Sequence, residues 1–216
     1  MPLYAILDAA TAQTVVAQVQ KYYASVQHVR GTFTEKVVNN TFGTNDTNEG
    51  KVYAEKPDHA RLEYLDKKGG TKRYFVTDGK TVWMVDAVNK VVRTGPVSGR
   101  AELTAFAFLS NGNLTADYNV TLTGSTILEL VPKTKSTVAK LMLVVDTSDG
   151  HVTESIVTNA NGDTDDFTWT LDPKGDVSSS WFSVDPNKLP STYTVEQLGS
   201  APATPAKTTT PPAKKP

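Results

Sequence analysis

Residues 71–86, TKRYFVTDGKTVWMVD, contain two short β-prone runs on either side of Asp78-Gly79. An Asp-Gly pair in this setting predicts a two-residue hairpin turn, because both central positions need a positive φ. With Thr77 opposite Lys80, one face of the hairpin carries Phe75, Val82 and Met84, and the other carries Tyr74, Val76, Trp83 and Val85. A hairpin with one solvated face alternates apolar and polar residues. This hairpin is apolar on both faces, so we expect another part of the chain to cover the second face.

Further short β-prone segments lie on both sides of the hairpin, separated by Gly, Asn, Asp and Pro. They are residues 30–38, 50–55, 59–65, 89–95, 117–122, 126–132, 138–146, 151–159, 166–171 and 180–184. Asn-Gly, Asp-Gly or Lys-Gly pairs in several connecting loops are typical of an antiparallel meander. The loop between the first two segments covers residues 39–48.

Two segments have helical periodicity. In residues 11–27 one helical face is apolar, with Thr11 as N-cap, and it carries Val15, Val19, Tyr22 and Val26. Residues 100–111 predict a short apolar helix between a cap at Ser98 and a stop at Gly112, with Leu103, Phe106, Phe108 and Leu109. The sequence therefore predicts an α+β domain with ten or eleven antiparallel strands in one large curved sheet.

The chain of 216 residues divides into a body and two flanking segments. We interpret residues 1–10 as a leader or a cloning remnant, residues 11–190 as one domain, and residues 199–216, rich in Ala, Pro, Thr and Lys, as a disordered tail.

Composition argues against several functions. The net charge of −1 argues against nucleic acid as a partner, since phosphate binding needs a basic stripe. No cysteine is present, which excludes thiol chemistry, disulfides and an acylated N-terminal Cys. His28, His59 and His151 are scattered among predicted strands, and the acidic cluster 159–166 lacks calcium-loop order and reads as a solvated hairpin turn. We therefore expect neither an enzyme nor a metal or cofactor site.

Two interpretations of the doubly apolar hairpin remain. In the first, the two helices pack on its second face and close the core. In the second, the helices cover the concave face loosely and leave an apolar cavity. Such a cavity suits acyl chains, whose binding needs apolar area, at about 25 cal/mol per Å², and few specific contacts.

Spaced motifs make the chain resemble the LolA family over about residues 12–190. They are GTFTEKV (31–37), GKVYAEKP (50–57), ARLEY (60–64), VTDGKTVWMVD (76–86), LTAFAFLSNGN (103–113), LELVPK (128–133), SDG (148–150), ANGDTDDF (160–167) and WFSVDPNKLP (181–190). The resemblance implies an unclosed β-barrel, or half-barrel, with helices as a lid on the concave face.

The resemblance also implies a function. LolA-like proteins are periplasmic chaperones that take acylated lipoproteins from an inner-membrane ABC transporter and pass them to an outer-membrane receptor. By this resemblance we expect a monomeric periplasmic carrier without a cofactor. The implied lipid-binding cavity consists of Phe33, Ala60, Leu62, Tyr64, Phe75, Met84, Leu103, Phe106 and Leu109.

One position departs from the family pattern. In the motif GKVYAEKP (50–57), family members have an arginine immediately before the proline, where it helps to hold the lid shut. In this chain that residue is Lys56. Lysine lacks the planar fork of arginine, so we expect a weaker lid clasp.

Other functions stay open at this point. Similar half-barrels serve as envelope-stress sensors that bind lipid, although these usually carry a second domain. Others are general lipid or glycolipid carriers with an acylated Cys that this chain lacks. An enzyme is disfavoured by the residue inventory.

Overall fold

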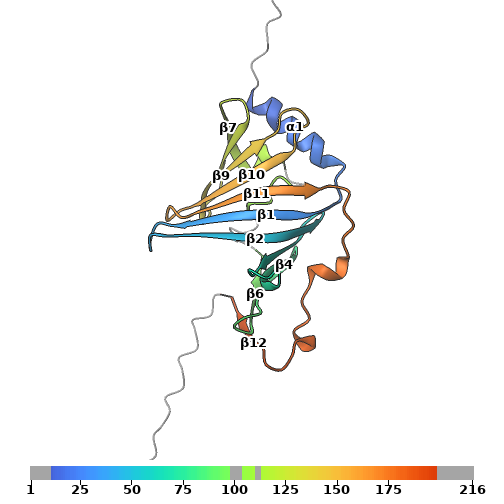
Figure 1. The fold of residues 1–216 in the computed structure, drawn as a ribbon. Coiled ribbons are helices and arrows are strands. Elements are labelled where there is room, and N and C mark those ends of the chain that lie inside the picture. Colours follow the sequence, from blue (N-terminus) through green and yellow to red (C-terminus); the bar gives the residue numbers. More distant parts are fainter. Residues whose placement is uncertain (1–10, 98–103, 110–112, 199–216) are drawn as a thin grey trace, which may run out of the picture.

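The computed structural model describes residues 11–97, 104–109 and 113–198 (Figure 1). The strands are β1 (His28–Asn39), β2 (Thr44–Glu55), β3 (His59–Leu65), β4 (Thr71–Asp78), β5 (Thr81–Asp86), β6 (Val91–Pro96), β7 (Tyr118–Thr123), β8 (Ile127–Pro132), β9 (Val138–Val145), β10 (Val152–Asn159), β11 (Thr164–Asp172) and β12 (Thr194–Gln197). The described helices are α1 (Ala12–Ala24), α3 (Leu114–Asp117) and the 3₁₀ turns η1 (Ser179–Phe182) and η2 (Pro186–Lys188).

The twelve strands of the described residues belong to one unclosed sheet, in the order β12-β6-β5-β4-β3-β2-β1-β11-β10-β9-β8-β7. Strands β1–β6 form one antiparallel meander and β7–β11 form a second, and the pairing of β1 with β11 joins them. β12 returns to the far edge and pairs with β6 in parallel. The predicted single curved antiparallel sheet is thus confirmed in outline, with one parallel pair.

The hairpin of residues 71–86 keeps its predicted faces but has a different turn. Thr77 pairs with Val82 and not, as predicted, with Lys80. In the observed turn Gly79 has a φ of +81°. The Asp78 carboxylate accepts hydrogen bonds from the backbone N–H groups of Lys80 (2.9 Å) and Thr81 (2.7 Å). Because a register shift of two residues preserves the alternation, every side chain stays on its predicted face.

We call the face of the sheet that carries Phe75 and Met84 the inner face and the opposite one the outer face. The C-terminal chain, not a helix, covers the outer face of the hairpin, which corrects our expectation. In Figure 1 this chain (orange) runs from β11 past the sheet to β12. Its turn η1 contacts β3 and β4. Three outer-face residues of β4, β5 and β6 are buried: Val76, Val85 and Val92.

Phe182 anchors the C-terminal chain on the outer face. Its side chain is 1% exposed and stacks on the ring of His59 with centroids 5.4 Å apart. The neighbouring Trp181 meets Tyr53 edge-on (4.9 Å), and its carbonyl accepts a hydrogen bond from Arg61 (3.3 Å). The inserted ring and its neighbours build a second, smaller core outside the sheet.

The strand predicted at residues 180–184 is therefore wrong. The alternation of large side chains there resembles a strand, but only Phe182 is fully buried, and the backbone turns to insert it. Strand β12 and helix α3 were not predicted, and β2 begins inside the predicted loop 39–48.

Helix α1 begins as predicted and ends earlier. The Thr11 hydroxyl accepts a hydrogen bond from the Thr14 N–H (3.2 Å), which confirms the N-cap. The helix ends at Ala24, with Ser25 as C-cap, so its buried face consists of Val15, Val16, Val19 and Tyr23. Tyr22, predicted on that face, is only partly buried. The buried face continues from Val19 to Tyr23, a spacing of four residues, and not from Val19 to Tyr22, the predicted spacing of three.

The predicted helix 100–111 is described only at residues 104–109. These form turns with hydrogen bonds from Ala107 N–H to Thr104 C=O (3.0 Å) and from Leu109 N–H to Phe106 C=O (2.8 Å). The predicted cap, the predicted stop and Leu103 lie outside the described residues.

Candidate functional site

The predicted cavity residues that the structure describes lie on the inner face or against it. Ala60, Leu62 and Tyr64 alternate along β3 and are all buried. Across the sheet, the register places Phe75 opposite Leu62, Met84 opposite Phe75, and Phe33 and Tyr64 on either side of Gly50. Phe106 and Leu109 of segment 104–109 are buried too, whereas nothing is described of Leu103.

An aromatic cluster occupies the middle of the inner face. The Phe33 ring centroid lies 5.2 Å from Tyr64, 5.7 Å from Phe167 and 5.8 Å from Trp169. Phe106 packs on Trp169 from segment 104–109 (5.0 Å). The cluster divides the inner face into two parts along the strands.

Phe167 and Trp169 were missed by sequence reasoning. Their alternation in the segment DFTWTL places both rings on one face of β11, and this was the available signal. The Trp169 indole donates a hydrogen bond to the Ser155 hydroxyl (2.9 Å), which fixes the ring on the buried side. Gly50 leaves room for Phe33, because a Cβ there would lie 2.3 Å from its Cζ atom.

The first cavity lies on the α1 side of the aromatic cluster and has a volume of about 520 Å³. Its apolar lining comes from both meanders and from segment 104–109: Val26, Val29, Ala54, Ala60, Phe106, Leu109, Leu114 and Val138. Polar and charged residues contribute the rest, including Gln27, Glu55, Lys56, Asp58, His59 and Asp117. Both the volume and the mixture are typical of ligand pockets, which span roughly 300–1,000 Å³.

The second cavity lies on the other side of the cluster and has a volume of about 410 Å³. Its apolar wall includes Leu62, Tyr64, Phe75, Met84, Val157 and Phe167. Charged residues also line it: Glu35, Arg73, Asp86, Arg93 and Asp165. The predicted single cavity is therefore divided: Ala60, Phe106 and Leu109 line the first cavity, Leu62, Tyr64, Phe75 and Met84 line the second, and Phe33 lies in the cluster between them.

Lys56 lies at the first cavity and contacts α1. Its ammonium donates a hydrogen bond to the backbone carbonyl of Tyr23, in the last turn of the helix. Burial lowers the pKa of Lys56. A cation at a helix C-terminus is favourable because it meets the unpaired carbonyls and the negative end of the helix dipole. Among the described contacts, then, Lys56 holds α1, while its predicted role as a lid clasp stays a prediction.

Replacing Lys56 with methionine is expected to lower the free energy of unfolding by about 1 kcal/mol, since it removes a charge-assisted hydrogen bond at a partly exposed site. Urea denaturation would measure the loss. Lys51→Met, at an exposed position of β2, the strand that ends just before Lys56, is the matched control and should cost little. Equal losses in both variants would show that the contact with α1 adds no stability.

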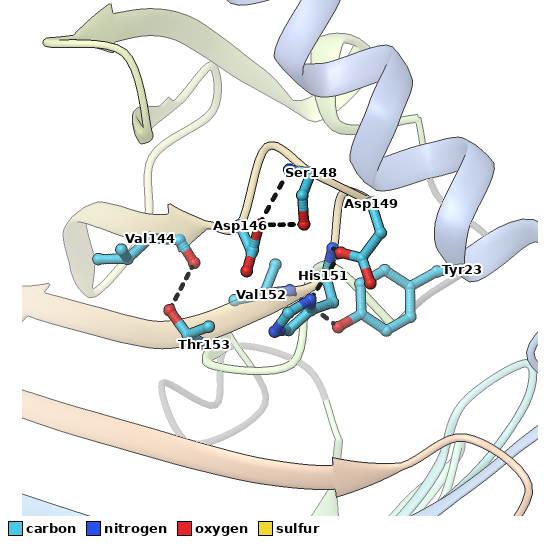
Figure 2. A network of polar contacts seen from close by, with 8 residues as sticks. All are labelled: Tyr23, Val144, Asp146, Ser148, Asp149, His151, Val152 and Thr153. Atoms are coloured by element: carbon cyan, nitrogen blue, oxygen red, sulfur yellow. Dashed lines mark hydrogen bonds and ion pairs between the residues drawn. The ribbon is translucent and has the colours of Figure 1, made fainter.

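A polar network fixes the other side of α1 to the β9–β10 turn (Figure 2). The Tyr23 hydroxyl accepts a hydrogen bond from the Val152 N–H (3.1 Å), and burial raises the pKa of this tyrosine. Within the turn, the Asp149 carboxylate contacts the His151 backbone N–H (2.9 Å) and Nδ1 (2.6 Å), and these hydrogen bonds lower the pKa of Asp149. Gly150, with a φ of +93°, approaches the helix so closely that a Cβ would lie 2.5 Å from the Gln18 carbonyl oxygen.

No group of three or more His, Asp or Glu side chains among the described residues is arranged to hold a metal ion. The residues 159–166 form the end of the β10–β11 hairpin, where Gly162 has a φ of +88°. No helix within the described ranges is long and apolar enough to cross a membrane.

Residues 24–199 match the profile of the family described as outer membrane lipoprotein carrier protein LolA. No curated protein matches the chain.

Solved structures share the fold at low identity. An uncharacterized conserved protein from Thermus thermophilus is 14% identical with a TM-score of 0.51, over 86% of this chain and 98% of that chain. A DUF1329 family protein from Desulfovibrio piger is 11% identical with a TM-score of 0.50, over 80% and 97% of the two chains. A LolA superfamily protein from Nitrosomonas europaea is 14% identical with a TM-score of 0.48, over 82% and 99%.

Proposed function

Since the chain belongs to the LolA family of outer membrane lipoprotein carrier proteins, we propose that it is a periplasmic chaperone that shields the acyl chains of lipoproteins between the inner and outer membranes. The family match confirms the resemblance read from the spaced motifs. Because the family is one of carriers and not of enzymes, it also confirms that the chain is not an enzyme.

The first cavity is the observation that supports this proposal most directly. Aliphatic and aromatic residues form one part of its wall, so an acyl chain placed against them leaves water without requiring specific polar partners. Segment 104–109 contributes Phe106 and Leu109 to the lining, and the Phe108 ring packs on Tyr23 of α1 (5.1 Å). In the proposed mechanism this segment and the end of α1 act as the lid.

Lys56 has a place in the same mechanism. It lines the first cavity and binds the last turn of α1, so release of this contact would free the helix end beside the cavity. The donor in the proposed route is an inner-membrane ABC transporter, and the acceptor is an outer-membrane receptor. We propose that the carrier acts as a monomer, with a domain body that extends beyond residue 190 to include β12.

Titration with a fluorescent sixteen-carbon fatty acid tests the acyl site. The wild-type protein is expected to bind the probe saturably. Ala60→Trp places an indole in the first cavity and should weaken binding about tenfold, which corresponds to about 1.4 kcal/mol. Val88→Trp, at a 71% exposed turn position, is the matched control and should bind as the wild type does.

Two outcomes would count against the proposal. Unchanged binding in a folded Ala60→Trp variant would exclude the first cavity as the acyl site. A second assay separates a carrier from a lipid sensor: native mass spectrometry of protein taken from the periplasm should find bound lipoprotein, and that lipoprotein should transfer to acceptor membranes. Bound lipid that is never transferred would favour the sensor.

A further inference from the structure

The second cavity differs from the first in that one of its carboxylates, Glu35, is buried. Its apolar wall is interrupted by carboxylates from three strands, Glu35 on β1, Asp86 on β5 and Asp165 on β11. Two guanidinium groups line it as well. Arg93 is bound to Glu196 of β12 (3.0 Å) and helps to lower the pKa of Asp86, whereas Arg73 lies beside Glu35. An acyl chain does not need a buried carboxylate, so the proposed acyl function of the first cavity does not explain Glu35.

Glu35 is the most buried charge in this cavity. The residue is 4% exposed, and its two carboxylate oxygens accept hydrogen bonds from the Tyr64 hydroxyl (3.0 Å) and the Asn48 amide (2.9 Å). A carboxylate offers about four acceptor positions, so part of its capacity remains. The Arg73 Nη2 atom is 4.0 Å away, which is too far for a hydrogen bond. Burial raises the pKa of Glu35, because these contacts compensate only part of the lost hydration.

Arg73 shows that a cation can occupy this position. Its guanidinium lies 4.2 Å from the centroid of the Tyr64 ring, and its side chain is half exposed. Lys72 approaches the same network by donating to the Asn48 side chain (3.1 Å). A cation with a better approach to Glu35 would gain the acceptor capacity that Arg73 leaves unused.

We propose that the second cavity binds a primary ammonium group carried on an apolar chain. The ammonium has three donors and no fixed plane, so it reaches Glu35 more easily than the guanidinium does. The chain of such an amphiphile would lie on the apolar wall formed by Leu62, Phe75, Met84 and Val157. This site goes beyond the proposed carrier function and does not require that the first cavity bind acyl chains.

Three probes with the same twelve-carbon tail test the site: dodecylammonium, dodecanol and dodecanoate, each titrated by calorimetry below its micelle-forming concentration. The wild-type protein should bind dodecylammonium about tenfold more tightly than dodecanol. Glu35→Gln should remove most of this preference and leave dodecanol binding unchanged. Ala60→Trp, which fills only the first cavity, should leave the binding of the amine unchanged.

Salt provides a measurement that needs no variant. Between about 20 and 500 mM salt, the wild-type affinity for dodecylammonium should fall while that for dodecanol holds, because only the first interaction is ionic. Equal affinities for amine and alcohol at low salt, or tighter binding of dodecanoate, would overturn the proposal. A Glu35→Gln variant that folds and keeps the full preference would do the same. The acyl-site assay with Ala60→Trp fails or succeeds independently of these outcomes.

Discussion

Replacing Phe182 with alanine is expected to lower the free energy of unfolding by about 3–5 kcal/mol, the usual cost of removing a fully buried aromatic ring. The ring is 1% exposed and stacks on His59, so its loss leaves a void between the C-terminal chain and the outer face of β3 and β4. Guanidinium denaturation followed by tryptophan fluorescence would measure the effect.

Trp181→Ala is the matched control, because it removes a larger ring from the adjacent position. Trp181 is 41% exposed and contacts Tyr53 at the surface, so its loss should cost less than half as much. If the two variants lose equal stability, the C-terminal chain only lies on the sheet and the outer face does not contain a second core.

Replacing Gly150 with alanine is expected to cost about 3 kcal/mol or more. An alanine at a φ of +93° is strained by roughly 1–3 kcal/mol. The new Cβ would also lie 2.5 Å from the Gln18 carbonyl oxygen and 2.6 Å from its carbon, both of which belong to the backbone of α1. The helix must therefore move away from the β9–β10 turn, and hydrogen exchange of its amides should accelerate more than that of the sheet.

Gly124→Ala separates strain from collision. Gly124 also has a positive φ, of +64°, but a Cβ there meets nothing within 4 Å. This control should lose only the strain and leave exchange in α1 unchanged. If Gly150→Ala is no more destabilising than Gly124→Ala, the turn does not hold the helix.

The inner face could be predicted from the sequence because alternation alone decides it. Phe75 and Met84 reached their predicted face although the turn was shifted, since a shift of two residues conserves parity. The outer face could not be predicted in the same way. Its cover comes from Phe182, about a hundred residues further along the chain, and nothing local in the hairpin indicates which distant segment packs there.

The candidate site was predicted as a set of residues but not as two cavities. Whether neighbouring apolar residues enclose one space or two depends on how large rings from different strands meet. Here Phe33 reaches Trp169 and Phe167 only because β1 pairs with β11. Glu35 shares the buried face of Phe33 by alternation, which is a signal in the sequence, but its partners Tyr64 and Asn48 come from two other strands.

The pairing of β1 with β11 also bears on how the chain folds. Within each meander, neighbouring strands are joined mostly by short loops, so most contacts there close small loops at little entropic cost. The pairing of β1 with β11 instead joins residues from opposite ends of the domain, and contacts of this kind slow folding. The two meanders are therefore suited to form early and separately, with the seam between them closing late. The C-terminal chain leaves β11 of the second meander and covers the outer face of the first. Its docking is therefore a second link between the two meanders, in addition to the pairing of β1 with β11.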